Sequence, residues 1–151
     1  MSQYFKFEED FVEANIRCIP MIARFKLDAC GIKMKLKEWS SMNEEERTNI
    51  SEYDCATEDE IQSYRQYVKT VILFRTSHEA EDMEVDQEPA WADKNCVPET
   101  VQQKLSSLHF LLEPVKWKQL NDLQRFVLVK LSRPSHENRN FPIAMKEFGL
   151  L

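Results

Sequence analysis

A cluster of polar and cationic side chains lies between two apolar runs near the C-terminus, in the string SRPSHENRN at residues 132–140. Arginine can form paired hydrogen bonds with phosphate or carboxylate oxygens, and asparagine and histidine add further donors. This string therefore predicts a binding site for a phosphate, another oxyanion or a carboxylate-bearing protein surface. The residues that we expect to bind are Arg133, His136, Asn138, Arg139 and Asn140.

The charge of this segment supports binding, whereas helix capping explains part of the same residues. Residues 124–140 carry a net charge of +3, within a chain whose net charge is −6. Ser135 or Asn140 can cap a helix that follows. Asn138 suits a turn, and Arg133 can satisfy carbonyl groups at the end of a preceding helix. Capping needs one or two polar groups, so the surplus favours binding, and both interpretations remain open.

Apolar spacing and capping residues indicate the elements that must position this segment. Pro20, Pro98 and Pro142 suit the first turns of helices, and Gly31 and Gly149 suit left-handed C-caps. The pattern predicts helices near residues 8–16, 19–30, 44–54, 58–76, 98–112, 118–132 and 141–148. We therefore expect an all-α fold, a single-domain helical bundle of about six to seven helices that spans residues 1–151.

The stretch near residues 77–95 lacks helical periodicity and is rich in acidic residues. Its apolar content is too low for packing, which predicts a mobile acidic loop. Trp91 interrupts the stretch. Such a tryptophan can anchor a partner, or it can attach the end of the loop to the core.

A short repeat links two parts of the chain. The same spacing recurs in two sets of residues, which are Trp39, Met42, Asn43, Glu46 and Arg47, and Trp117, Leu120, Asn121, Gln124 and Arg125. Thr57 and Ser135 each follow their tryptophan by 18 residues and can each act as an N-cap. Two helical hairpins about a pseudo-twofold axis would give this pattern, and so would chance similarity between two amphipathic helices.

Composition excludes several classes of protein. Residues 17–37 carry a local charge of +5 and residues 43–99 a local charge of −11, which fits a charged docking face and argues against a nucleic-acid binder. No apolar run has the roughly 18 residues that a membrane span needs, so we expect no membrane insertion. The N-terminus is acidic and aromatic, unlike a signal peptide, which predicts a cytoplasmic protein.

The sequence offers no recognised catalytic or cofactor motif. The four cysteines, Cys18, Cys30, Cys55 and Cys96, lack the close spacing of zinc or iron–sulfur sites. The chain contains no P-loop, glycine-rich dinucleotide turn or HExxH motif. We therefore predict no catalytic residues, no metal site and no cofactor. An enzyme that pairs His109 or His136 with a cysteine or carboxylate is the least favoured alternative.

Three strings carry a family resemblance: FKFEEDFVEANIRCIPMIARFKLDACGIKMKLKEW at residues 5–39, DCATEDEIQSYRQYV at 54–68 and LQRFVLVKLSRPSHENRNFPIAMKEFGL at 123–150. They closely resemble the conserved nitrate reductase-associated protein family of cyanobacterial type. The resemblance implies a non-catalytic accessory or maturation factor for molybdenum-dependent nitrate reductase in nitrate assimilation. Nitrate reductase or its molybdenum-cofactor loading machinery is the implied partner. The alternative is a small binding protein for an anionic ligand, such as the molybdopterin cofactor or molybdate.

Overall fold

The computed structural model describes residues 3–134 and 136–151, with only the backbone described at 136 and 137. Helices dominate this part of the chain, and its sheet consists of two strands of two residues each. The all-α prediction is therefore confirmed. The chain divides into two compact units, residues 1–86 and 87–151. No helix in the described ranges is both long enough and apolar enough to cross a membrane.

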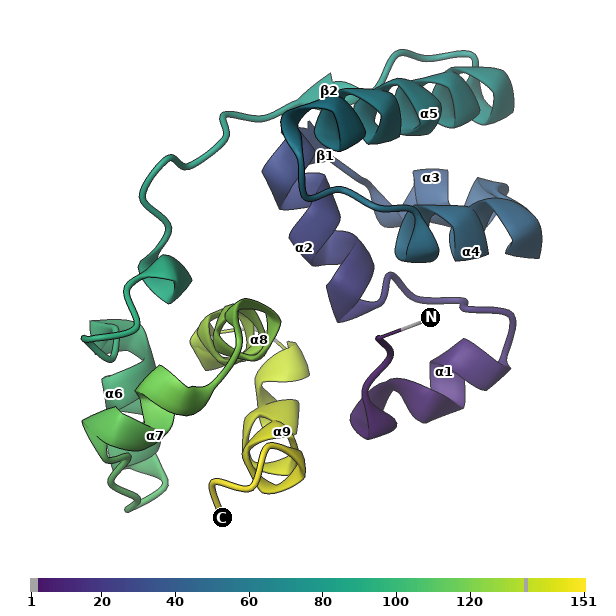
Figure 1. The fold of residues 1–151 in the computed structure, drawn as a ribbon. Coiled ribbons are helices and arrows are strands. Elements are labelled where there is room, and N and C mark those ends of the chain that lie inside the picture. The colour runs from purple at the N-terminus through teal and green to yellow at the C-terminus, as the bar shows by residue number, and fades with distance from the viewer. Residues whose placement is uncertain (1–2, 135) are drawn as a thin grey trace. The chain divides into compact units, whose positions relative to one another are not determined.

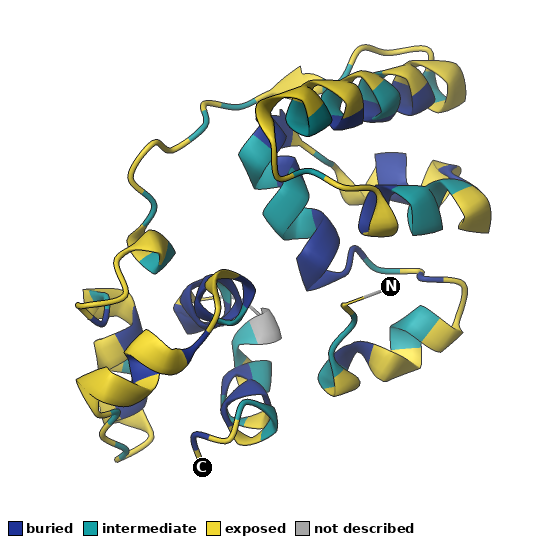
Figure 2. Ribbon diagram, viewed as in Figure 1, coloured by how far each residue is buried: buried dark blue, intermediate teal, exposed yellow. Residues whose placement is uncertain are grey.

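In the first unit, the long helix α5 lies across three other helices (Figure 1). Its buried residues face α2, α3 and α4, while its outer face is exposed (Figure 2) and includes the apolar Leu73 and Phe74 as well as polar residues. The elements of this unit are η1 (Lys6–Glu8), α1 (Glu9–Glu13), α2 (Met21–Cys30), β1 (Ile32–Lys33), α3 (Leu36–Ser41), α4 (Glu44–Glu52), α5 (Glu58–Thr76) and β2 (Glu81–Asp82).

In the second unit, α8 is the central element and contacts α6, α9 and both short 3-10 helices (Figure 1). It is buried on almost every side, as the dark colour in Figure 2 shows. The elements of this unit are η2 (Ala90–Ala92), α6 (Glu99–Ser107), α7 (Pro114–Gln119), α8 (Asp122–Ser132), η3 (His136–Asn140) and α9 (Phe141–Glu147).

Helix boundaries follow the predicted caps where the signal is local. Thr57 Oγ1 accepts the N–H of Glu60 over 3.1 Å, and Glu60 Oε1 accepts the N–H of Thr57 over 2.9 Å, so α5 begins where predicted. Gly31 and Gly149 have φ of 77° and 78°, as their predicted role as left-handed C-caps requires.

Three helix predictions were wrong in their extent, and one helix was missed. The helix predicted over 8–16 ends at Glu13, and Asn15 and Ile16 then have left-handed φ of 59° and 51°. Residues 36–41 form α3, which was not predicted. The helix predicted over 118–132 is broken, because Leu120 is extended and Asn121 starts a new helix with its own cap. The helix predicted over 98–112 ends at Ser107, and His109 then adopts a left-handed φ of 56°. Periodicity detects an apolar face, but it does not detect a break that preserves the face.

The acidic stretch near residues 77–95 contains ordered elements that were not predicted. In β2, Asp82 pairs with Ile32 and Glu81 with Lys33, in antiparallel register. The strands escaped prediction because two residues are too few to show alternation. Arg65 also reaches Asp82, and this ion pair joins α5 to β2. The mobility of the remaining stretch stays a prediction.

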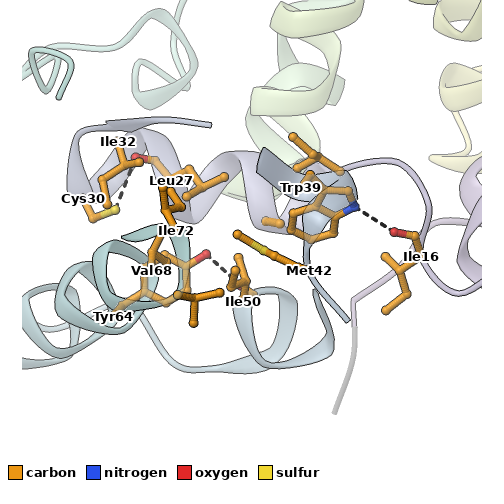
Figure 3. Packing of buried hydrophobic residues seen from close by; sticks show 13 residues of the cluster. Ile16, Leu27, Cys30, Ile32, Trp39, Met42, Ile50, Tyr64, Val68 and Ile72 are labelled. Atoms are coloured by element: carbon orange, nitrogen blue, oxygen red, sulfur yellow. Dashed lines mark hydrogen bonds between the residues drawn. The ribbon is translucent and has the colours of Figure 1, made fainter. Parts of the chain in front are cut away.

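Two buried hydrogen bonds fix the core of the first unit (Figure 3). The indole Nε1 of Trp39 donates to the carbonyl of Ile16 over 2.8 Å. The hydroxyl of Tyr64, on α5, donates to the carbonyl of Ile50, on α4, over 2.7 Å. Because burying an unpaired polar group is costly, these bonds allow large amphipathic rings to fill the core.

Candidate functional site

The polar segment predicted as a binding site begins where α8 ends. The side chain of Ser132 donates to the carbonyl of Val129 over 2.7 Å, and Arg133 then turns extended, with ψ of 148°. Pro134 explains this ending, since a residue before proline avoids the helical region. The segment is therefore attached to a rigid, buried helix.

The segment continues as η3 and runs directly into α9. Asn140 has helical φ and ψ of −81° and −8°, and its side chain makes no capping hydrogen bond. The proposed cap by Asn140 is therefore wrong, because a capping side chain needs extended backbone at that position. The alternative cap, Ser135, lies outside the described residues. The start of α9 is instead secured by Phe141, which is fully buried, and by Pro142 in the first turn.

Two of the five predicted residues present their side chains to solvent. Arg133 and Arg139 are exposed, and neither guanidinium group has a hydrogen bond or ion pair within the described residues. Asn138 and Asn140 are half-buried. In a 3-10 helix, side chains of successive residues point about 120° apart, so Asn138, Arg139 and Asn140 do not share one face. The backbone of His136 belongs to η3, but its side chain lies outside the described residues.

Arg125 contributes to the charge of the segment but not to its surface. Its side chain is 4% exposed and donates to the carbonyl of Leu120 and to the carboxylate of Asp122. Its Nε also donates to the carbonyl of Trp91 over 2.8 Å. This bond attaches the end of the acidic stretch to α8, in line with the structural interpretation of Trp91. Charge counting missed the burial because it does not distinguish a capping arginine from a solvated one.

We name the exposed cationic surface formed by Arg133 and Arg139 the cationic corner. Lys130, one turn before it, is half-buried, with its ammonium 5.4 Å from the centre of the Phe126 ring. Two exposed guanidinium groups that form no ion pair within the described residues can bind carboxylates or phosphates.

Two of the thiols, Cys30 and Cys55, are not activated for nucleophilic chemistry. Burial raises the pKa of Cys30 to about 11 and that of Cys55 to about 12, so both remain protonated at neutral pH. All four cysteines are free, and within the described ranges no group of three or more His, Cys, Asp or Glu side chains is placed to hold a metal.

A second surface was missed in the sequence. Leu111, which the pattern placed inside a helix, lies in the connection between α6 and α7 and is 91% exposed. A cavity beside this connection is lined in part by Leu105, Phe110 and Leu112. The signal that could have revealed the surface is the run LHFLL, which is apolar except for His109 and follows a helix whose apolar face is already complete.

Comparison with known proteins gives one match. The model of the family described as conserved nitrate reductase-associated protein matches residues 4–148. No curated protein and no solved structure gives a significant match.

Proposed function

Because the chain belongs to the conserved nitrate reductase-associated protein family, we propose that it is a non-catalytic accessory protein for molybdenum-dependent nitrate reductase. In this proposal it supports assembly or activity of the reductase by direct contact in the cytoplasm. The partner is nitrate reductase itself or the machinery that loads its molybdenum cofactor. The contact surface is the cationic corner with the adjacent residues His136, Asn138 and Asn140.

The observation that carries the proposal is the pair of exposed guanidinium groups at the end of a buried helix. Arg133 and Arg139 have no partner within the described residues, in a chain of net charge −6. A structural arginine is normally engaged, as Arg125 is by two carbonyls and a carboxylate in the same unit. Exposed arginines, whose planar guanidinium groups can bind carboxylates in a bidentate geometry, suit an acidic protein surface and set its orientation.

The test is copurification with nitrate reductase from nitrate-grown cells of the source organism. We expect the double variant Arg133→Ala/Arg139→Ala to bind about tenfold more weakly, which corresponds to roughly 1.4 kcal/mol. Reductase activity and its molybdenum content should fall in cells that carry this variant. Circular dichroism would show that the fold is retained, as expected for two exposed side chains.

The matched control is Lys94→Ala/Lys118→Ala, which removes the same charge from exposed positions of the same unit. Equal losses in both variants would indicate a general charge effect and count against the corner. Calorimetry with molybdate and with the isolated cofactor tests the alternative ligand-binding function. Heat that disappears in the arginine variant would favour direct binding of an anion instead of a protein surface.

A further inference from the structure

The repeat seen in the sequence is present in the structures of both units. Trp39 and Trp117 each donate their indole N–H to a backbone carbonyl, over 2.8 and 3.0 Å. Asn43 and Asn121 each accept, at their side chain, a backbone N–H from three residues further on, both over 2.8 Å. The members of each pair are 78 residues apart.

The correspondence also covers α2 and α6. Pro20 and Pro98, again 78 residues apart, are the N-caps of these helices. The side chains of Arg24 and Gln102, which have the same separation, each donate to a carbonyl five residues earlier, over 3.2 and 3.1 Å. The chain therefore contains two versions of one helical arrangement, without a gap between their aligned residues.

By the same offset, residues 110 and 111 take the place of the two residues of β1. In the first unit this edge is covered by β2, and the ammonium of Lys33 lies 3.7 Å from the carboxylate of Glu81. The N–H of Met83 donates to the carbonyl of Gly31 over 2.9 Å. The acidic stretch of the chain itself thus occupies the edge in the first unit.

The corresponding edge of the second unit is open. Leu111 is 91% exposed, and within the part of the chain that the structure describes, the backbone groups of Leu111 and Leu112 have no hydrogen-bond partner. The N–H of Phe110 is used by the end of α6, since it donates to the carbonyl of Leu105 over 3.0 Å. An apolar edge whose backbone groups are unpaired within the described residues can act as a template for another strand.

We infer that residues 110–112 bind an extended, apolar segment of a partner protein by antiparallel strand addition. The occupied edge of the first unit supplies the model for this contact, and the cavity beside Phe110 and Leu112 can receive side chains of the added strand. The inference does not depend on the cationic corner or on nitrate reductase as the partner.

We infer an apolar partner segment because two cationic residues of the first unit are replaced by apolar residues in the second. In the first unit, Lys33 pairs with Glu81, and Arg65 pairs with the next acidic residue of β2. At the offset of 78, Lys33 becomes Leu111 and Arg65 becomes Ile143, which is 51% exposed. An acidic strand would therefore lose its counter-charges, whereas an apolar side chain opposite Leu111 would gain a cross-strand contact.

His109 limits how far a docked strand can pair along this edge. Its equivalent in the first unit is Gly31, where an added Cβ would lie 2.8 Å from the carbonyl oxygen of Met83. Since His109 carries a Cβ at a similar left-handed φ, a docked strand must leave the path of β2 before it reaches this residue. Pairing is therefore centred on Leu111, whose equivalent, Lys33, lies opposite Glu81.

The test uses the full-length chain, labelled for NMR, and two nine-residue peptides. One peptide has the chain's own sequence at residues 79–87, and the other carries Glu81→Val and Asp82→Val. We expect the apolar peptide to shift the amide signals of residues 110–112 and to show cross-strand contacts with them. Leu111→Lys should weaken this binding about two- to fivefold and strengthen binding of the acidic peptide by a similar factor.

Matched variants separate this contact from nonspecific adhesion. Leu73→Lys changes an equally apolar residue that is 50% exposed on α5, and it should leave the binding of both peptides unchanged. Combining Leu111→Lys with His109→Gly should strengthen binding of the acidic peptide further, because the edge then matches that of the first unit. Absence of shifts at residues 110–112 with millimolar apolar peptide would overturn the inference. Self-association that Leu111→Lys abolishes would assign the edge to a second copy and would also overturn it.

Discussion

The two units contain the same tryptophan–asparagine–arginine arrangement but cover it differently. In the first unit, α5 supplies apolar side chains over α2, α3 and α4, and Arg47 at the end of the arrangement is half-buried. In the second unit, α8 carries the arrangement and is itself the central helix, so the equivalent Arg125 is almost fully buried. The asparagine caps are the same in both units, whereas the two arginines bind different groups, so their contributions to stability should differ.

The same contrast applies to the connection that follows α2 and α6. In the first unit it is paired with β2, and Gly31 allows the close approach of that strand. In the second unit the connection has apolar residues and a histidine at the corresponding turn. Duplicated architecture can therefore keep its helices while one edge is closed internally and the other is left for an external partner.

The largest expected effect comes from removing either tryptophan. Trp39→Ala and Trp117→Ala should each lower the free energy of unfolding by about 3–5 kcal/mol, because each ring is fully buried and each indole satisfies a carbonyl. Urea denaturation would measure the loss. Hydrogen exchange should show that amide protection is lost first in the unit that carries the substitution. A loss below about 1 kcal/mol in one unit would show that the repeated arrangement is not equally structural there.

Substituting the two arginines should change the free energy of unfolding by different amounts, whereas substituting the two tryptophans should change it by similar amounts. Arg125→Ala should cost about 3 kcal/mol, since it leaves the carbonyl of Leu120 buried without its donor and also removes the donor to the carbonyl of Trp91 and the carboxylate of Asp122. Arg47→Ala should cost about 1 kcal/mol, because the three carbonyls that it binds lie closer to solvent. Denaturation of both variants would measure the difference, and equal losses would contradict it. Lysine at either position should recover little, because lysine cannot reproduce the planar fork.

The sequence predicted those features whose cause is local. Thr57 and Glu60 placed the start of α5 correctly because the capping box uses only neighbouring residues. The break between α7 and α8 was missed, although Asn121 repeats the role of Asn43, because the apolar face continues across it. Pairing of β1 with β2 could not be predicted, since it joins residues about 50 positions apart through two residues on each strand.

The candidate site was only partly predictable for a similar reason. Composition located the cationic segment, and exposure then selected Arg133 and Arg139 from it. Formal charge could not reveal that Arg125 is buried, because that burial depends on a carbonyl 34 residues away, in η2. The open edge at Leu111 became recognisable only through comparison with β1, which requires both units to be folded.

Gly31, the C-cap of α2, and His109, its equivalent after α6, should respond to substitution with opposite signs. Gly31→Ala should destabilise by about 2 kcal/mol, because a left-handed residue gains a Cβ that collides with the carbonyl oxygen of Met83, the residue after β2. His109→Gly should stabilise by roughly 0.5–1 kcal/mol, because it relieves a left-handed non-glycine residue at a site where the structure describes no pairing strand. Thermal and urea denaturation would measure both values. Stabilisation by Gly31→Ala would show that β2 does not approach as closely as described.

Alkaline pH should destabilise the first unit, whose core contains thiol and phenol groups with raised pKa values. Burial raises the pKa of Cys30 from 9.0 to about 11, and the pKa values of Cys55 and Tyr64 in the same core are also raised. For such groups, stability is fully present below the unfolded-state pKa and is lost as pH rises above it, because the unfolded chain releases the proton first. Cys30 alone should therefore cost the first unit on the order of 1 kcal/mol at pH 10. Hydrogen exchange corrected for its intrinsic pH dependence would follow the loss. In the Cys30→Ala variant, the loss of stability between pH 9 and 11 should be smaller. An unchanged dependence of stability on pH would exclude burial of this thiol as a cause.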